Sequence, residues 1–244
     1  RRVTDWRIGQ LQRMPNVDIY RDSRMTAVDV LETGIEHVIL ATGCTYRRDG
    51  IGRTLWQPIP GHDLPHVLTP EDIFKGRTAA GHVVIYDDDH YVMAGALAER
   101  CALLGCTVAL VTPAPEVSYW TRFTLEQERI EKRLRSLGVT LYTKHTLSLI
   151  EADSIAVTDG MTGEVRALRA DTVLLVTDRS PNDGLYYELE PALAEGRLQS
   201  LRIIGDAEAP HLLAQAVFSG HRAAREFGEQ QMEGTPFRVE RITV

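Results

Sequence analysis

A strand–turn–helix pattern near the middle of the chain has the frame of a dinucleotide-binding site. Residues 83–99 read VVIYDDDHYVMAGALAE, which is an apolar strand, a short loop and a helix of small residues. In a working site, glycines in this loop let the backbone approach a pyrophosphate, and the helix N-terminus binds its charge. Here Asp87, Asp88 and Asp89 stand in the place of the glycines.

The three aspartates oppose a diphosphate by both size and charge. At an effective dielectric constant of about 20, two unit charges about 4 Å apart repel by about 4 kcal/mol. That is half of the roughly 8 kcal/mol that a micromolar affinity represents. The next strand ends in Thr112 and Pro113, where a ribose-binding site would have Asp or Glu. We therefore predict a Rossmann scaffold that has lost its nicotinamide site, with Ala94 keeping the helix close to the sheet.

The same loop contains residue types that bind metal ions. Three carboxylates and the His90 imidazole are plausible ligands for a divalent cation. Consecutive loop residues rarely converge on one ion, however, and the sequence offers no distant partner. A hydrogen-bonded loop is therefore the favoured interpretation, and no metal site and no catalytic residue are predicted.

Two further motifs flank this unit, VILATGC at 38–44 and RIIGDAEAPHLLAQAVFSGHRAA at 202–224. Gly43 has no Cβ and lets a ligand approach the backbone. A helix is expected to begin near Pro210, and its first N–H groups can bind an anion. The Asp206 carboxylate can accept hydrogen bonds from a ribose hydroxyl. A role for Asp206 in a simple turn or cap is the alternative.

The elements that must position these motifs alternate between strands and helices. Continuously apolar strands indicate parallel sheets covered on both faces, hence the α/β class. In the first part of the chain, the patterns predict a helix at 1–14, a strand at 16–20, a buried strand at 37–43 and a loop at 44–76 that ends in a short helix (TPEDIFKG). In the middle, they predict a strand at 82–86, a helix at 92–104, a strand at 107–113 and an amphipathic helix at 121–138 with Leu125, Ile130, Leu134 and Leu137 inward. Short strands from 139 to 170, a buried strand at 171–177, a strand and helix from 200 onward and an irregular tail at 232–244 complete the prediction.

Composition and charge exclude several classes of function. The 244 residues are 43% hydrophobic and 25% charged, as in ordinary globular proteins. The formal net charge of −7 argues against nucleic acid and against an anionic membrane surface. No apolar run is long enough to span a bilayer, and no signal peptide is expected. Three cysteines without a CxxC motif favour a reducing cytoplasm.

Two other groups allow both a functional and a structural interpretation. Tyr119 and Trp120 precede a helix, where they would stack on an adenine or pack a domain junction. The loop at 47–49, Arg-Arg-Asp, would face a ligand or form a solvated turn. Packing is the favoured interpretation of the aromatic pair, and the loop is left open.

The order of the motifs, ATG, then a βαβ unit, then GD, resembles flavoprotein disulfide reductases, in which a nicotinamide-binding domain interrupts a flavin-binding domain. Beyond this order, the chain resembles the C-terminal half of the trimethylamine, dimethylamine and histamine dehydrogenases and their 2,4-dienoyl-CoA reductase-like, old yellow enzyme-related relatives. The stretches that carry the resemblance are ILATGCTYRRDG, PIPG, TPEDIFKG, VVIYDDDHYVMAGALAE, VSYWTRFTLEQERI and IGDAEAPHLLAQAVFSGHRAARE.

The resemblance implies two Rossmann-like, three-layer domains, the second inserted in the first. An incomplete flavin- or ADP-binding-like domain would comprise 1–76 and 197–244, and an NAD(P)-binding-like domain would comprise 77–196. The first βαβ unit, with its GxGxxG, is expected upstream of residue 1. An ADP- or FAD-binding cleft would be lined by Thr42, Gly43, Gly205, Asp206 and Ala207, with weak or absent affinity in this chain alone.

In such enzymes an N-terminal TIM barrel holds FMN and a 4Fe–4S cluster. The resemblance implies that the parent protein is a cytoplasmic amine dehydrogenase and that this chain is its non-catalytic C-terminal nucleotide-binding module. The implied partners are the barrel of the same chain, further copies in a homo-oligomer, and an electron-transfer flavoprotein. The alternatives are a FAD- and NAD(P)H-dependent reductase module of the 2,4-dienoyl-CoA or enoate type, and a docking or dimerisation domain.

Overall fold

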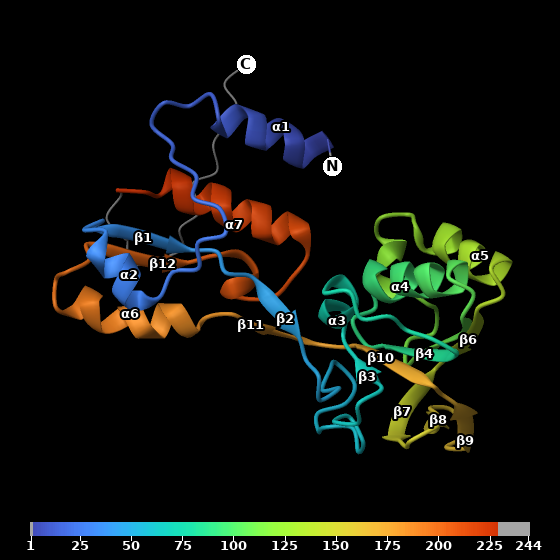
Figure 1. The fold of residues 1–244 in the computed structure, drawn as a ribbon. Coiled ribbons are helices and arrows are strands. Elements are labelled where there is room, and N and C mark those ends of the chain that lie inside the picture. Colours follow the sequence, from blue (N-terminus) through green and yellow to red (C-terminus); the bar gives the residue numbers. More distant parts are fainter. Residues whose placement is uncertain (1, 229–244) are drawn as a thin grey trace. The chain divides into compact units, whose positions relative to one another are not determined.

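The computed structural model describes residues 2–228, which fall into two compact units. Within the described residues, the first unit comprises 2–40 and 183–203, and the second comprises 41–182 and 204–228. Each unit has its own hydrophobic core (Figure 1). Among the described helices, none has the length and apolar character needed to cross a membrane. The nested pair of Rossmann-like domains with boundaries at 76/77 and 196/197 stays a prediction.

The first unit pairs two short parallel strands with helices. Its elements are α1 (Arg2–Leu11), α2 (Ala27–Glu32), β1 (His37–Leu40), α6 (Gly184–Ala194) and β12 (Ser200–Ile203). A capping box starts α2, because the Thr26 hydroxyl accepts the Asp29 N–H while the Asp29 carboxylate accepts the Thr26 N–H at 2.7 Å. The buried core consists of Val30, Leu40, Leu189, Ala192, Leu198 and Leu201.

A five-stranded parallel sheet forms the centre of the second unit. Its strand order is β3 (Val67–Leu68), β10 (Thr172–Val176), β4 (His82–Asp87), β5 (Thr107–Thr112) and β6 (Thr140–Thr143). The residues of β10 are all buried, as are those of β4 after His82. Strands that are covered on both faces are apolar throughout, so the predicted α/β class with a parallel sheet is confirmed.

Two layers cover this sheet, one on each face (Figure 1). Side chains alternate along β4, so that Val83 and Ile85 face one layer while Val84 and Tyr86 face the other. The helical layer is made of α3 (Pro70–Phe74), α4 (Val92–Leu103) and α5 (Gln127–Ser136). The other layer is the antiparallel sheet β7 (His145–Ile150), β8 (Ser154–Asp159) and β9 (Val165–Arg169).

The remaining elements of the second unit are short and carry the motifs that flank the aspartate loop. Strand β2 (Cys44–Tyr46) pairs antiparallel with β11 (Arg179–Pro181). Two turns of 3₁₀ helix and a longer helix complete the unit, namely η1 (Tyr119–Arg122), η2 (Gly205–Ala207) and α7 (Leu213–Arg225).

Most predicted elements are confirmed, and several predictions are wrong. No strand forms at 16–20, and the predicted loop at 44–76 contains β2 and β3. The strand predicted as buried at 37–43 is β1, in which only Leu40 is buried and Ile39 is 41% exposed. The reason is that β1 pairs only with β12 among the described residues, so no broad sheet surrounds it. The predicted tail at 232–244 lies outside the described residues.

The helix predicted at 121–138 is also divided in the structure. The Thr121 hydroxyl donates to the Ser118 carbonyl at 2.7 Å, and the Glu126 N–H donates to the Thr121 carbonyl at 3.0 Å. These bonds close a turn before α5 begins at Gln127. Leu125 lies in that turn with φ of 59° and is 93% exposed, so its predicted inward position is wrong.

Gly61, the glycine of the PIPG segment, is a position where only glycine fits. Its φ is 87°, and an added Cβ would overlap the carbonyl oxygen of Ile150. Gly76 has a similar φ of 95° but open space around it. We expect Gly76→Ala to lower the free energy of unfolding by about 1–2 kcal/mol through backbone strain. Gly61→Ala should lower the free energy of unfolding further, because the turn must also move. Urea unfolding of both variants measures the difference. Equal losses of stability in the two variants would contradict the clash.

Candidate functional site

The aspartate loop lies at the carboxyl end of β4, where open α/β sheets bind their ligands. Asp87 and Asp88 are fully buried, and Asp89 and His90 are each 8% exposed. The N–H groups of Asp88 and Asp89 both donate to the Val176 carbonyl of β10, at 2.9 and 3.1 Å. His90 has φ of 63°, in the left-handed region that favours glycine. The loop is thus folded inward on the sheet.

Protein groups satisfy the Asp88 carboxylate. Its Oδ2 accepts the Thr54 N–H and its Oδ1 accepts the Thr54 hydroxyl, both at 2.8 Å. The Nε2 atom of His90 lies 3.2 Å from Oδ1. Gly52 packs against the same carboxylate so closely that a Cβ there would overlap it. In a dinucleotide site this loop would face a pyrophosphate, whereas here it faces its own protein.

Asp87 is the least satisfied member of the loop. Its Oδ1 accepts the His90 N–H at 2.8 Å, while its Oδ2 has no hydrogen-bonding partner among the described residues. Burial raises the pKa of Asp87 to about 7, against the opposing effect of His90. Burial also raises the pKa of Asp89, although the charges of Arg179 and Arg53 act to lower it. Part of the loop's negative charge is therefore neutralised by protons near neutral pH.

Arg179 connects the aspartate loop to the GD motif. Its guanidinium lies 3.8 Å from Oδ1 of Asp89 and 3.4 Å from Oδ2 of Asp206, and its side chain is 16% exposed. It also donates to the His211 carbonyl at 3.1 Å and lies over the Tyr46 ring, 5.7 Å from the centroid. Arg179 is not among the residues predicted for the site; its only signal in the sequence is a basic residue three positions after the buried strand β10.

The structure brings the GD motif and the ATGC motif together. The Asp206 carboxylate accepts the His211 N–H at 3.1 Å, and the thiol of Cys44, next to Gly43, donates to it at 3.4 Å. Burial and Asp206 raise the pKa of Cys44 to about 11, which makes this thiol a poor nucleophile. The expected acceptor Asp206 is therefore already engaged by protein donors.

The other residues predicted to line the cleft have distinct surroundings. Gly43 has φ of 73° and open space where a Cβ would be, so its backbone is approachable. Thr42 is exposed and donates its hydroxyl to the Asn182 carbonyl at 2.5 Å, so only the acceptor sites of this hydroxyl are left for a ligand. Gly205 has φ of 64° and donates its N–H to the Ser219 hydroxyl at 2.8 Å. Ala207 is 1% exposed.

The remaining candidates are held by internal partners. Arg47 pairs with Asp49 at 2.5 Å, and Arg48 pairs with Asp72.

A shallow pocket of about 480 Å³ is lined by Tyr46, Arg47, Arg48, Asp49, His62, Asp63 and Ser180. The described residues contain no group of three or more His, Cys, Asp or Glu side chains that could hold a metal ion. Cys44, Cys101 and Cys106 are free thiols.

Comparison with known proteins shows which sequences and structures this chain is similar to. The family model of the OYE-like second alpha/beta domain matches residues 68–177. Dimethylamine dehydrogenase from Hyphomicrobium sp. (strain x) is 33% identical over 251 residues, which cover 91% of this chain and 34% of that protein. Histamine dehydrogenase from Rhizobium sp. 4-9 has 41% sequence identity to this chain, and its structure superimposes with a TM-score of 0.92. The match covers 100% of this chain and 38% of the histamine dehydrogenase chain.

Two further structures mark the range of the similarity. The 6-hydroxypseudooxynicotine amine oxidase HisD from Pseudomonas geniculata N1 is 42% identical with a TM-score of 0.90, covering 93% of this chain and 34% of its own. A 2-naphthoyl-CoA reductase is 18% identical with a TM-score of 0.75, covering 91% of this chain and 31% of its own, and shares the fold alone. The chain thus spans little more than a third of the length of its amine-named relatives.

The raised pKa of Asp87 predicts a specific dependence of stability on pH. Folding raises this pKa from 3.8 to about 7, so the contribution of Asp87 to stability falls as pH rises from about 4 to about 7 and is constant above. Asp87→Asn keeps the Oδ1 acceptor and removes the ionisation. We expect the variant to be more stable than the wild type at pH 8, by an amount on the order of 1–4 kcal/mol, with a smaller gain at pH 5.

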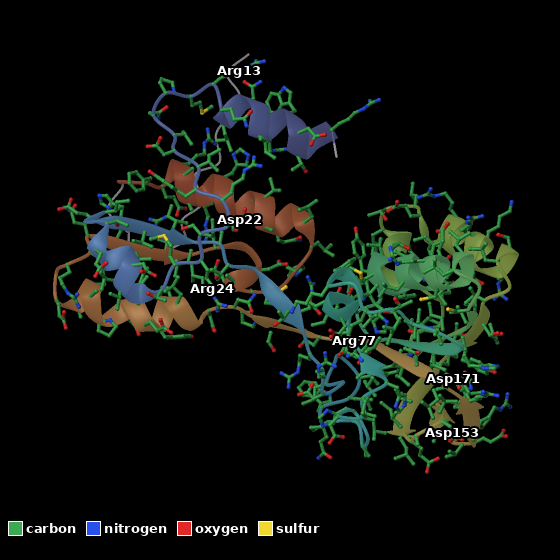
Figure 2. The ribbon with its side chains drawn as sticks, viewed as in Figure 1. Arg13, Asp22, Arg24, Arg77, Asp153 and Asp171 are labelled. Carbon is green, nitrogen blue, oxygen red and sulfur yellow. The ribbon has the colours of Figure 1, made fainter. Side chains whose placement is uncertain are left out.

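Asp171 provides a control of opposite sign (Figure 2). Hydrogen bonds from the N–H and the imidazole of His82 lower the pKa of Asp171 to about 2. Its contribution is present above pH 4 and is lost as pH falls toward 2, so Asp171→Asn should destabilise at pH 8. Urea unfolding at both pH values checks the pair. A loss of stability in Asp87→Asn at pH 8 would show that Asp87 is ionised without penalty.

Removing the Arg179 cation should leave the two carboxylates that it contacts without a positive partner, and so should reduce stability. We expect Arg179→Met to lower the free energy of unfolding, because Asp89 and Asp206 lose their cationic partner in a largely buried place. Adding Asp89→Asn should restore part of the loss, with a coupling energy of about 1–3 kcal/mol in a double-mutant cycle. Strictly additive losses would rule out the contact between Arg179 and Asp89.

Proposed function

Since the chain belongs to the trimethylamine and dimethylamine dehydrogenase-like, old yellow enzyme-related family, we propose that it is the C-terminal module of a flavin-dependent amine dehydrogenase. The relatives that share 33–42% identity with it are named for amine substrates. The reductase of an acyl-CoA thioester shares only 18% identity. This contrast favours the amine-oxidising branch over the reductase alternative.

We also propose that the module is non-catalytic, and the aspartate loop is the observation that supports this. A reductase module must admit NAD(P)H at the carboxyl end of β4. Here Asp87 and Asp88 are fully buried there, and Thr54, His90 and Val176 take up the polar groups of the loop. A pyrophosphate would have to displace these bonds and add its charge to three carboxylates. The Rossmann scaffold therefore serves structure rather than hydride transfer.

The second nucleotide position, near Gly43 and Gly205, fits an ADP or FAD-like group in part. Gly43 leaves open space beside its backbone, and the first turn of α7, which lacks an acidic residue, follows the GD motif. Asp206 can accept a ribose hydroxyl only alongside its present donors, Cys44, Arg179 and the His211 N–H. The 244 residues contain no GxGxxG. We therefore expect the isolated chain to bind ADP weakly.

Calorimetry on the isolated chain tests these nucleotide assignments directly. We expect dissociation constants above about 1 μM for both ADP and NADH, because the ADP position lacks its glycine loop and the NADH position is filled by aspartates. Asp206→Asn should weaken ADP binding further, while Asp159→Asn, at the far end of β8, serves as a matched control. A submicromolar constant for NADH would contradict the non-catalytic assignment.

The redox chemistry of the parent protein would come from FMN and a 4Fe–4S cluster in an N-terminal TIM barrel outside these residues. We place the parent in the cytoplasm, with homo-oligomers and an electron-transfer flavoprotein as its partners. The role of the present chain is to be a nucleotide-binding neighbour of that barrel. A docking or dimerisation role is compatible with the same fold.

Assays on the full-length protein separate the two enzymatic alternatives. We expect small amines to support reduction of an artificial dye, and we expect no oxidation of NADH under the same conditions. The aspartate loop predicts this asymmetry because it blocks the hydride donor of a reductase. NADH oxidation at a rate comparable to amine-dependent dye reduction would instead establish the reductase alternative.

A further inference from the structure

An exposed cluster of large side chains lies beside the aspartate loop. We call it the aromatic platform and define it as Arg53, Trp120, Phe123 and Leu125. Trp120, Phe123 and Leu125 are 43%, 79% and 93% exposed. The rings of Trp120 and Phe123 lie 5.9 Å apart, and the Arg53 guanidinium lies 5.6 Å from the Trp120 ring centroid.

The backbone beneath the platform is ordered although its side chains face outward. Ser118 and Thr121 are fully buried, and the Thr121 hydroxyl donates to the Ser118 carbonyl at 2.7 Å. The Glu126 N–H donates to the Thr121 carbonyl at 3.0 Å. Both Ser118 and Leu125 have left-handed φ values, 51° and 59°. Strained residues of this kind persist where the surroundings hold them, and they gather at functional segments.

The aspartate loop holds both halves of the platform in place. The His90 carbonyl accepts the Trp120 N–H at 2.9 Å, and the His90 ring contacts Asp88. Asp88 in turn accepts two hydrogen bonds from Thr54, the residue after Arg53. The carboxylates that replace the glycines therefore position the Trp120 segment and the Arg53 segment against each other. The loop that opposes a cofactor builds a surface instead.

A pre-ordered cluster of this composition is suited to binding protein. Scattered exposed apolar residues are ordinary, but Trp and Arg held at fixed positions are typical of interface hot spots. We propose that the aromatic platform docks the N-terminal part of the full-length protein, which lies outside these 244 residues. The contacted surface would be apolar, with carboxylate or carbonyl oxygens facing Arg53. This inference rests on the proposed function in one respect, that the parent contains such a part.

Size and tethering favour this occupant over a second copy of the chain. The relatives extend far beyond the matched segment, which is only 34–38% of their length. Three side chains with these exposed fractions offer on the order of 400 Å². A stable interface between separate molecules needs about 800 Å² on each partner. A covalently linked partner is present at high effective concentration, so a smaller surface is sufficient.

Thiol labelling of the full-length protein tests whether the platform is covered. Leu125→Cys carries the probe, and Met161→Cys is the matched control, because Met161 is 75% exposed in the turn between β8 and β9. We expect maleimide to label residue 125 about tenfold or more slowly than residue 161 in the native protein, and equally fast in urea. Equal native rates would overturn the proposal.

Photo-cross-linking identifies the occupant. Phe123→p-benzoylphenylalanine in the full-length protein should give cross-links within one molecule, to peptides that precede this chain. Cross-links between molecules, or labelling protection that is lost on dilution, would overturn the proposal in favour of a second copy. Absence of cross-links would overturn docking altogether.

Flavin content and amine-dependent dye reduction are measured on the same samples. Protection of residue 125 in a protein without amine activity would leave the docking surface intact and remove the proposed function. Amine activity without protection of residue 125 would support the proposed function and overturn the docking surface. The two proposals therefore fail by different results.

Discussion

The desolvation of three consecutive carboxylates at the end of β4 constrains everything around them. A buried carboxylate is costly unless donors or cations reach it. Thr54 and His90 supply donors to Asp88, and Arg179 supplies charge to Asp89. Each of these partners comes from a different part of the second unit. The loop thereby ties together segments that lie far apart in the sequence.

This substitution changes what the crossover between β4 and α4 contributes. In a cofactor site the loop must stay open, because its backbone N–H groups donate to the bound ligand. Here the N–H groups of Asp88 and Asp89 bond to Val176, so the loop is complete without one. The scaffold keeps its parallel sheet and its close helix, while buried side chains occupy the loop where a dinucleotide lies in a working site. The same internal order supports the prediction that no nicotinamide cofactor binds here.

The sequence was sufficient to predict what depends on periodicity and burial. The strands β4, β5 and β10 each have a continuous apolar run, and the acidic first turn of α3 follows Thr69, so their existence and type could be predicted. The helix expected at 121–138 was not, because its amphipathic pattern continues through Leu125. Local hydrogen bonds among Ser118, Thr121 and Glu126 close the turn there. The Trp120 N–H also donates to the distant His90 carbonyl, a contact that no local pattern reveals.

The site was predicted less completely than the sheet, since its key contacts join distant residues. The aspartates were visible from their place in the fingerprint. Thr54, by contrast, lies 34 positions from Asp88, and Arg179 lies 27 positions from Asp206. Whether Gly43 and Gly205 contact a nucleotide remains a prediction. Spacing along the chain gives residue types for a site, but it does not give the partner of each charge.

The two-stranded sheet of the first unit has a consequence for association with extended peptides. Strands β1 and β12 pair with each other, and among the described residues neither has a second strand neighbour. Strand edges of this kind take up additional strands when a suitable segment is supplied. An extended peptide can therefore add to either outer edge as a further strand.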